Sequence, residues 1–141
     1  WSYNCRLDEL QAALLRVQLK NLDKQIKKKR KLAKILNEEL NEIVNVPFEN
    51  EGEFHVYQTY VIQSEARDKL KEYLISKGIE AFIHYPVPLH LQPAAKDLNY
   101  SANEFPKTME LSSKILSLPL YPSMEEDKLE YLIKTFKKFF K

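Results

Sequence analysis

The sequence contains very little glycine. Only 2 of its 141 residues are glycine, whereas globular proteins average about 7%. Phosphate-binding loops of the P-loop and Rossmann types need closely spaced glycines, because their backbone must approach the phosphate without side chains in the way. The composition therefore excludes these two kinds of nucleotide site.

Cysteine, long apolar runs and an excess of one charge are also lacking. The single cysteine, Cys5, permits neither a disulfide framework nor a cysteine-based metal cluster, and it suits a reducing cytoplasm. No apolar run approaches the roughly 18 residues that a membrane helix needs, and no signal peptide is present. We therefore expect a cytoplasmic protein without a membrane partner. The formal net charge of +2 argues against nucleic acid as the main partner.

The hydrophobic pattern predicts an α+β fold in one domain, residues 1–141. Two long N-terminal helices come first, and strands then alternate with helices, which indicates a small sheet of three or four strands with helices packed on it. We expect helices over residues 7–19, 21–43, 67–77, 94–98, 105–115 and 123–140, and strands over 44–48, 55–63, 79–84 and 116–120.

Particular residues mark the ends and inner faces of these elements. Gly78 is expected to stop a helix, and Ser123 is expected to cap the last one. The second helix has one apolar seam, formed by Leu22, Ile26, Ala33, Leu36, Leu40 and Ile43. The last helix should bury Leu129, Leu132, Ile133, Phe136, Phe139 and Phe140.

Two polar side chains lie directly before the first helix. Asn4 and Arg6 precede its first turn, which carries Asp8 and Glu9. An arginine fork matches phosphate oxygens, and donors at a helix N-terminus form an anion site. The alternative interpretation is that both residues only cap the helix and solvate its entry.

A proline-rich segment, residues 84–93, is the second candidate site. Its prolines fix the backbone, and the polar ends of His84, Tyr85, His90 and Gln92 are thereby held at set positions. Such a stiff loop suits a phosphate or a sugar hydroxyl. The alternative is a rigid connector whose Tyr85 packs in the core.

The sequence gives little support for a metal site, a cysteine nucleophile or a nucleic-acid-binding surface. His84 and His90 lie six residues apart in an irregular loop, which is not a zinc pattern, so we expect no metal site. Cys5 has no neighbouring base, and a lone cysteine is more often inert. The basic run Lys27–Lys31 points around the whole helix and therefore forms no single nucleic-acid-binding face.

Three ordered motifs resemble one enzyme family. The stretch from Tyr3 to Ala13 is similar to the Y-N-x-R-L-D-E-x-Q-A-A signature of the DegT/DnrJ/StrS sugar aminotransferases. The combination of His84-Tyr85-Pro86 with His90-Leu91-Gln92 resembles the second signature of this family, and Ser117–Pro122 resembles its L-S-L-P segment. These are fold type I enzymes that depend on pyridoxal 5'-phosphate, and the resemblance covers only the C-terminal part of a member.

The resemblance implies roles for the matching residues. Asn4 and Arg6 match residues that reach toward the cofactor phosphate or the substrate pyrophosphate in the partner subunit's active site. His84 and Tyr85 match residues beside a nucleotide-sugar, and His90 and Gln92 match the same motif. One departure is Gln58, where many relatives carry a histidine.

The resemblance also implies what this chain does not contain. The Schiff-base lysine and the acid beside the pyridine nitrogen lie in the family's large domain, upstream of Tyr3, so the small C-terminal domain alone should be inactive. The full-length protein should form a homodimer with shared active sites. The main apolar seam of the first helix is formed by Leu7, Leu10, Leu14 and Val17. Leu15 and Leu19 lie off this seam and favour such an interface.

A full-length member would move an amino group, from glutamate, to a nucleotide-linked keto-deoxysugar. The sequence of the second motif favours 3-keto over 4-keto sugars as substrates. The alternative is a non-catalytic module that keeps this fold for assembly or for sugar-nucleotide binding. The start at Trp1 rather than Met indicates a processed chain or a fragment.

Overall fold

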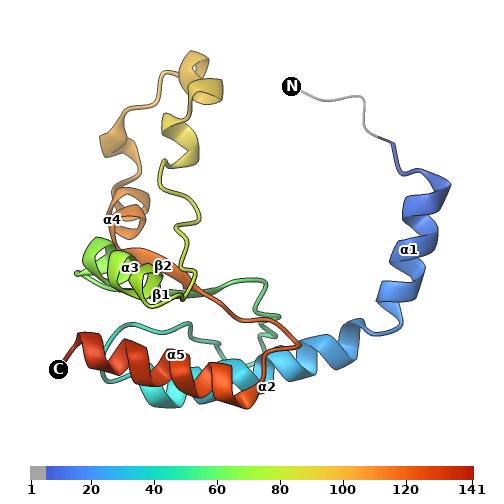
Figure 1. Ribbon diagram of the computed structural model, residues 1–141. Helices are drawn as coiled ribbons and strands as arrows, with labels where there is room; N and C mark the ends of the chain where they lie inside the picture. Colours follow the sequence, from blue (N-terminus) through green and yellow to red (C-terminus); the bar gives the residue numbers. More distant parts are fainter. Residues whose placement is uncertain (1–5) are drawn as a thin grey trace.

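Helices supply most of the ordered structure. The computed structural model describes residues 6–141, so the predictions for Asn4 and Cys5 lie outside the described residues. The α-helices are α1 (Glu9–Leu19), α2 (Leu22–Leu40), α3 (Arg67–Ser76), α4 (Pro106–Lys114) and α5 (Glu126–Phe139) (Figure 1). Three short 3-10 helices are η1 (Leu89–Leu91), η2 (Pro93–Leu98) and η3 (Ala102–Glu104).

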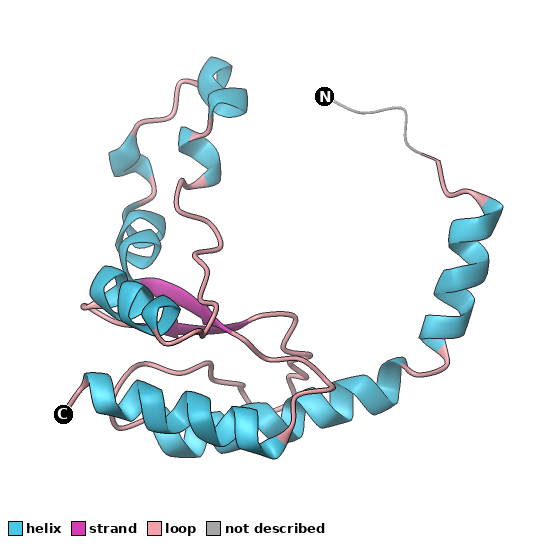
Figure 2. Ribbon diagram, in the orientation of Figure 1, coloured by secondary structure: helices cyan, strands magenta, loops and turns pink. Residues whose placement is uncertain are grey.

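The sheet is smaller than the sequence predicts. It has two antiparallel strands, β1 (Tyr60–Gln63) and β2 (Ile115–Leu118), with Tyr60 opposite Leu118. Each strand also pairs at one position with a residue outside the two strands. Asn45 pairs with Gln63 of β1, and Phe82 pairs with Ser117 of β2. The expectation of three or four strands is therefore wrong for residues 6–141, although the helix-on-sheet arrangement is present (Figure 2).

A proline limits the pairing of each outer segment on one side of its bridge. In an antiparallel ladder, the hydrogen-bonded pair after Asn45–Gln63 would join residue 47 to residue 61, and Pro47 has no N–H to donate. The pair after Phe82–Ser117 would likewise join residue 80 to residue 119, and Pro119 also lacks an N–H. Neither ladder therefore continues past its bridge in this direction.

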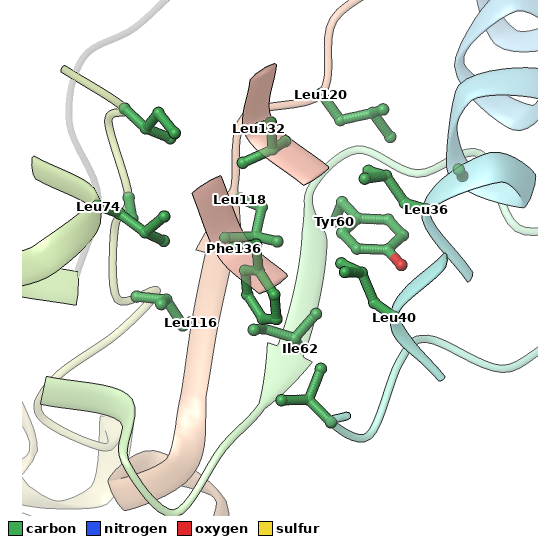
Figure 3. Close-up of a cluster of buried hydrophobic side chains, with 14 of the residues drawn as sticks. Leu36, Leu40, Tyr60, Ile62, Leu74, Leu116, Leu118, Leu120, Leu132 and Phe136 are labelled. Carbon is green, nitrogen blue, oxygen red and sulfur yellow. The ribbon is translucent and has the colours of Figure 1, made fainter. Parts of the chain in front are cut away.

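The core lies between the sheet and the neighbouring helices. On the strands, alternate side chains face the core, namely Tyr60 and Ile62 on β1 and Leu116 and Leu118 on β2 (Figure 3). Helix α2 and helix α5 run side by side against this face (Figure 1). The helices contribute the buried residues Ala33, Leu36, Leu40, Leu70, Leu74, Leu129, Leu132 and Phe136.

The predicted helix boundaries are largely confirmed, with one correction at α5. Gly78 follows α3 with a φ of 74°, as expected for a glycine that stops a helix. Ser123 does not cap α5, because a turn closed by the Met124 N–H and the Tyr121 carbonyl precedes the helix, and Glu125 is the N-cap. Phe140 is 39% exposed, so its predicted burial is also wrong.

Two parts of the chain extend away from the core. Helix α1 has no buried residue, and residues 84–105, here called the excursion, carry η1, η2 and η3 (Figure 1). The two extensions rise from opposite ends of the molecule. Within residues 6–141, no helix has both the length and the hydrophobicity to cross a membrane.

Candidate functional site

His84 lies at the edge of the sheet, where the excursion begins. Phe82, two residues earlier, exchanges both backbone hydrogen bonds with Ser117 of β2, at 3.1 and 2.7 Å. The His84 Nδ1 atom lies 2.9 Å from the Ser117 hydroxyl. The side chain of His84 is exposed, so its second ring nitrogen is available to a ligand.

Tyr85 extends the polar surface next to His84. Its ring is perpendicular to the His84 ring, with 5.6 Å between the centroids. Because Tyr85 is 66% exposed, the alternative in which it packs in the core is wrong. An exposed phenol beside an exposed imidazole provides two hydrogen-bonding groups and a stacking surface for a polar ligand.

His90 and Gln92 are engaged within the excursion itself. The His90 ring packs on Phe105 with 4.7 Å between centroids, and its Nε2 is buried without a hydrogen-bond partner among the described residues. The Gln92 side-chain amide donates to the Val87 carbonyl at 3.3 Å. These two contacts fold the excursion back on itself, and neither side chain contacts His84 or Tyr85.

Arg6 is exposed and lies in irregular chain just before α1. The N-cap of α1 is Asp8, and no side chain within residues 6–141 forms a capping hydrogen bond there. The alternative in which Arg6 caps the helix is therefore not what the structure shows. Arg6 and His84 lie on the two separate extensions (Figure 1), so this chain does not bring them together around one ligand.

A further cluster was not anticipated from the sequence. The Arg30 guanidinium of α2 bonds both carboxylate oxygens of Glu49, at 2.8 and 3.0 Å, and also the His55 carbonyl. These hydrogen bonds from Arg30 hold the pKa of Glu49 below its usual value. Phe54 lies under the guanidinium with its ring centroid 4.3 Å away.

The groove between α2 and α5, about 620 Å³ in volume, is rimmed by several lysines. Among them, Lys134 pairs with Glu130 and Lys137 with Glu39. A cofactor-holding lysine instead needs an enclosed site that favours its neutral amine. Lys134 and Lys137 do not have this setting, whereas the guanidinium donors of Arg6 suit a phosphate group.

Together these features define a small α+β domain whose polar, ligand-ready side chains lie on two exposed extensions. A family model described as the DegT/DnrJ/EryC1/StrS aminotransferase family matches residues 1–137. The chain belongs to this family, as its motifs indicated. Members of the family are pyridoxal-phosphate-dependent sugar aminotransferases, and homologues act on nucleotide-linked deoxysugars.

Relatives cover nearly the whole chain. A Geobacillus stearothermophilus "pleiotropic regulatory protein" is 36% identical over 99% of the chain. The dTDP-3-amino-3,6-dideoxy-alpha-D-galactopyranose transaminase of Aneurinibacillus thermoaerophilus is 31% identical over 96% of it. A DegT DnrJ EryC1 StrS aminotransferase from Brucella abortus superposes with a TM-score of 0.89 at 37% identity over 98% of it. The chain spans only 37–38% of these relatives.

Proposed function

We propose that the full-length protein is a pyridoxal-phosphate-dependent aminotransferase. It transfers an amino group from glutamate to a nucleotide-linked keto-deoxysugar, a 3-keto dTDP-sugar, for surface-polysaccharide, O-antigen or antibiotic sugar synthesis in a bacterial cytoplasm. Residues 1–141 form its C-terminal domain. The observation that carries this proposal is the family match over residues 1–137, and the Aneurinibacillus transaminase supports the dTDP-linked, 3-amino choice.

The positions of Arg6 and His84 favour a site shared between two subunits. Arg6 has the donor geometry for a phosphate, and with Asn4 it is assigned to the cofactor or substrate phosphate. His84 and Tyr85 are assigned to the nucleotide-sugar. Because α1, which Arg6 directly precedes, and the excursion that His84 begins are separate extensions of one chain, a homodimer accounts for both residues serving one active site.

We predict that His90 and Gln92 contact the substrate, and both side chains also shape the excursion. Their contacts with Phe105 and Val87 shape the excursion that carries His84 and Tyr85. A ligand that contacted either side chain would therefore also affect the shape of the loop. The Nε2 atom of His90 is buried and has no hydrogen-bond partner within residues 6–141, so such a ligand could supply one.

The reaction itself needs groups that this chain does not supply. When bound, pyridoxal phosphate provides the electron sink for amino transfer. The lysine that holds it and the acid beside its ring nitrogen are assigned to the part of the relatives that this chain does not span. The 141-residue chain alone is therefore expected to be inactive.

The direct test is an assay of the full-length protein. We expect an absorbance band of bound pyridoxal phosphate and glutamate-dependent amination of a dTDP-3-keto-deoxysugar, faster than that of UDP-linked or 4-keto analogues. Failure to bind the cofactor would refute the proposal. Binding of the nucleotide-sugar without cofactor or turnover would instead support a non-catalytic assembly or sugar-nucleotide-binding module. The coding region upstream of Trp1 provides a second check, because it should encode the lysine.

A further inference from the structure

Ser117 is a buried hydroxyl on the outer face of the sheet. Its neighbours Leu116 and Leu118 face the core (Figure 3). The alternation of a β-strand therefore directs Ser117 to the opposite face. The side chain is only 5% exposed. Its sole side-chain hydrogen-bond partner among the described residues is His84 Nδ1, at 2.9 Å.

The pairing of the sheet places His84 beside this hydroxyl. Ser117 and Phe82 are directly opposite each other, so their side chains lie on the same face. His84 follows Phe82 by two residues, which makes it the diagonal neighbour of Ser117, and the Phe82 and His84 rings are 6.0 Å apart. The backbone bonds and the side-chain bond together anchor the start of the excursion to β2.

The direction of the hydrogen bond follows from the burial of Ser117. If His84 donated from Nδ1, the buried hydroxyl hydrogen would have no acceptor among the described residues, and an unsatisfied buried donor is costly. If the hydroxyl donates to Nδ1, both groups are satisfied, and neutral His84 carries its proton on Nε2. The Nε2–H group of this exposed side chain is then the donor that a ligand can meet.

We propose that Ser117 is a positioning residue, which fixes the tautomer and orientation of His84 so that its Nε2–H donates to an oxygen of the substrate. This inference rests on the proposed function for the identity of the ligand, an oxygen-rich nucleotide-sugar. The Ser117–His84 arrangement itself is independent of any ligand. Ser117 therefore acts through His84 and does not contact the substrate.

The ligand-free test is 15N NMR of histidine-labelled full-length protein, with the His84 signal assigned by its loss in His84→Gln. At alkaline pH, where imidazole is neutral, we expect one tautomer with the proton on Nε2. Ser117→Ala should give a mixture of tautomers, and Ser117→Thr, which keeps a hydroxyl, should restore the single form. A proton on Nδ1, or an unchanged spectrum in Ser117→Ala, would overturn the inference.

The functional test is a double-mutant cycle on affinity for a dTDP-sugar. Ser117→Ala should weaken binding about three- to tenfold, as expected for one lost hydrogen bond, and should have no effect in a His84→Ala background. An equal loss in both backgrounds would show that Ser117 acts through the fold instead. If no variant and no wild-type protein binds the dTDP-sugar, the proposed function fails, while the NMR result still decides the role of Ser117.

Discussion

Arg30 and Glu49 form a two-pronged ion pair across 19 residues of chain, with hydrogen bonds of 2.8 and 3.0 Å. Glu49 also accepts the backbone N–H of His55, and Arg30 donates to the carbonyl of the same residue. The pair thereby fastens the loop between α2 and β1 to the surface of α2. Planar two-point pairing is the geometry in which an arginine cannot be replaced by lysine without loss.

Glu49→Gln should make the protein less sensitive to acid. The Arg30 hydrogen bonds lower the pKa of Glu49 from 4.5, so its ionised form stabilises the fold above that pH, and this stabilisation is lost as pH falls through the lowered pKa. The melting temperatures of the wild type and the variant should therefore differ most near neutral pH. This difference should begin to shrink as the pH falls below about 4.5 and should vanish below the lowered pKa of Glu49. Glu51→Gln is the matched control, because Glu51 is exposed in the same loop and forms no ion pair within residues 6–141. A difference that widened toward acid would contradict this reasoning.

Arg6→Ala should weaken ligand binding without weakening the fold. A charge-assisted hydrogen bond contributes about 1.5–3 kcal/mol, or roughly a factor of 10 to 100 in affinity for the cofactor or nucleotide-sugar. Arg6→Lys should recover only part of that, because lysine lacks the fork. Unfolding free energy should change by no more than about 0.5 kcal/mol, since Arg6 is exposed. Arg16→Ala, on α1 itself, is the control for loss of charge. A large drop in melting temperature with unchanged affinity would assign Arg6 a structural role.

Leu36→Ala should be among the most destabilising substitutions in this domain. Leu36 is fully buried where α2 meets the sheet, and removing a buried leucine side chain costs about 2–5 kcal/mol. Ile75→Ala, at a residue that is 52% exposed, should cost about 0.5 kcal/mol or less. Urea unfolding of the two variants measures both values, and similar losses would show that the core is not where the structure places it.

Leu14→Glu should disrupt self-association. Leu14 is 59% exposed on a helix with no buried residue, and burying a leucine in an interface contributes about 1.5–3 kcal/mol. The dimer dissociation constant, measured by sedimentation, should rise at least about tenfold. Leu98→Glu introduces the same charge at an exposed leucine of the excursion. If Leu98→Glu disrupts the dimer and Leu14→Glu does not, the interface lies elsewhere.

Local patterns predicted much of this fold. The helical spacing of Leu129, Leu132 and Phe136 indicated the buried face of α5, and Gly78 indicated the end of α3. The strands were predicted too long, because β-branched and aromatic composition does not show where a partner strand can continue to pair. Pro47 and Pro119 decide that, and their effect is visible only once the register is known.

The candidate site was predictable only where a motif carried it. His84 and Tyr85 were identified from their proline-rich setting, and both are exposed as a binding role requires. The Ser117–His84 contact and the Arg30–Glu49 pair join residues 33 and 19 positions apart. No periodicity of the sequence links such residues, so only the folded chain brings them into view.

The lack of any buried residue on α1 has a thermodynamic consequence. None of its 11 residues is buried within residues 6–141, so packing there stabilises it little, and isolated helices shorter than about 12–15 residues are only marginally stable in water. Whatever surface covers the leucines of α1 must therefore also supply the free energy that keeps it helical. Ordering of this helix and assembly of the protein are then one coupled equilibrium, so helicity near the N-terminus should depend on protein concentration.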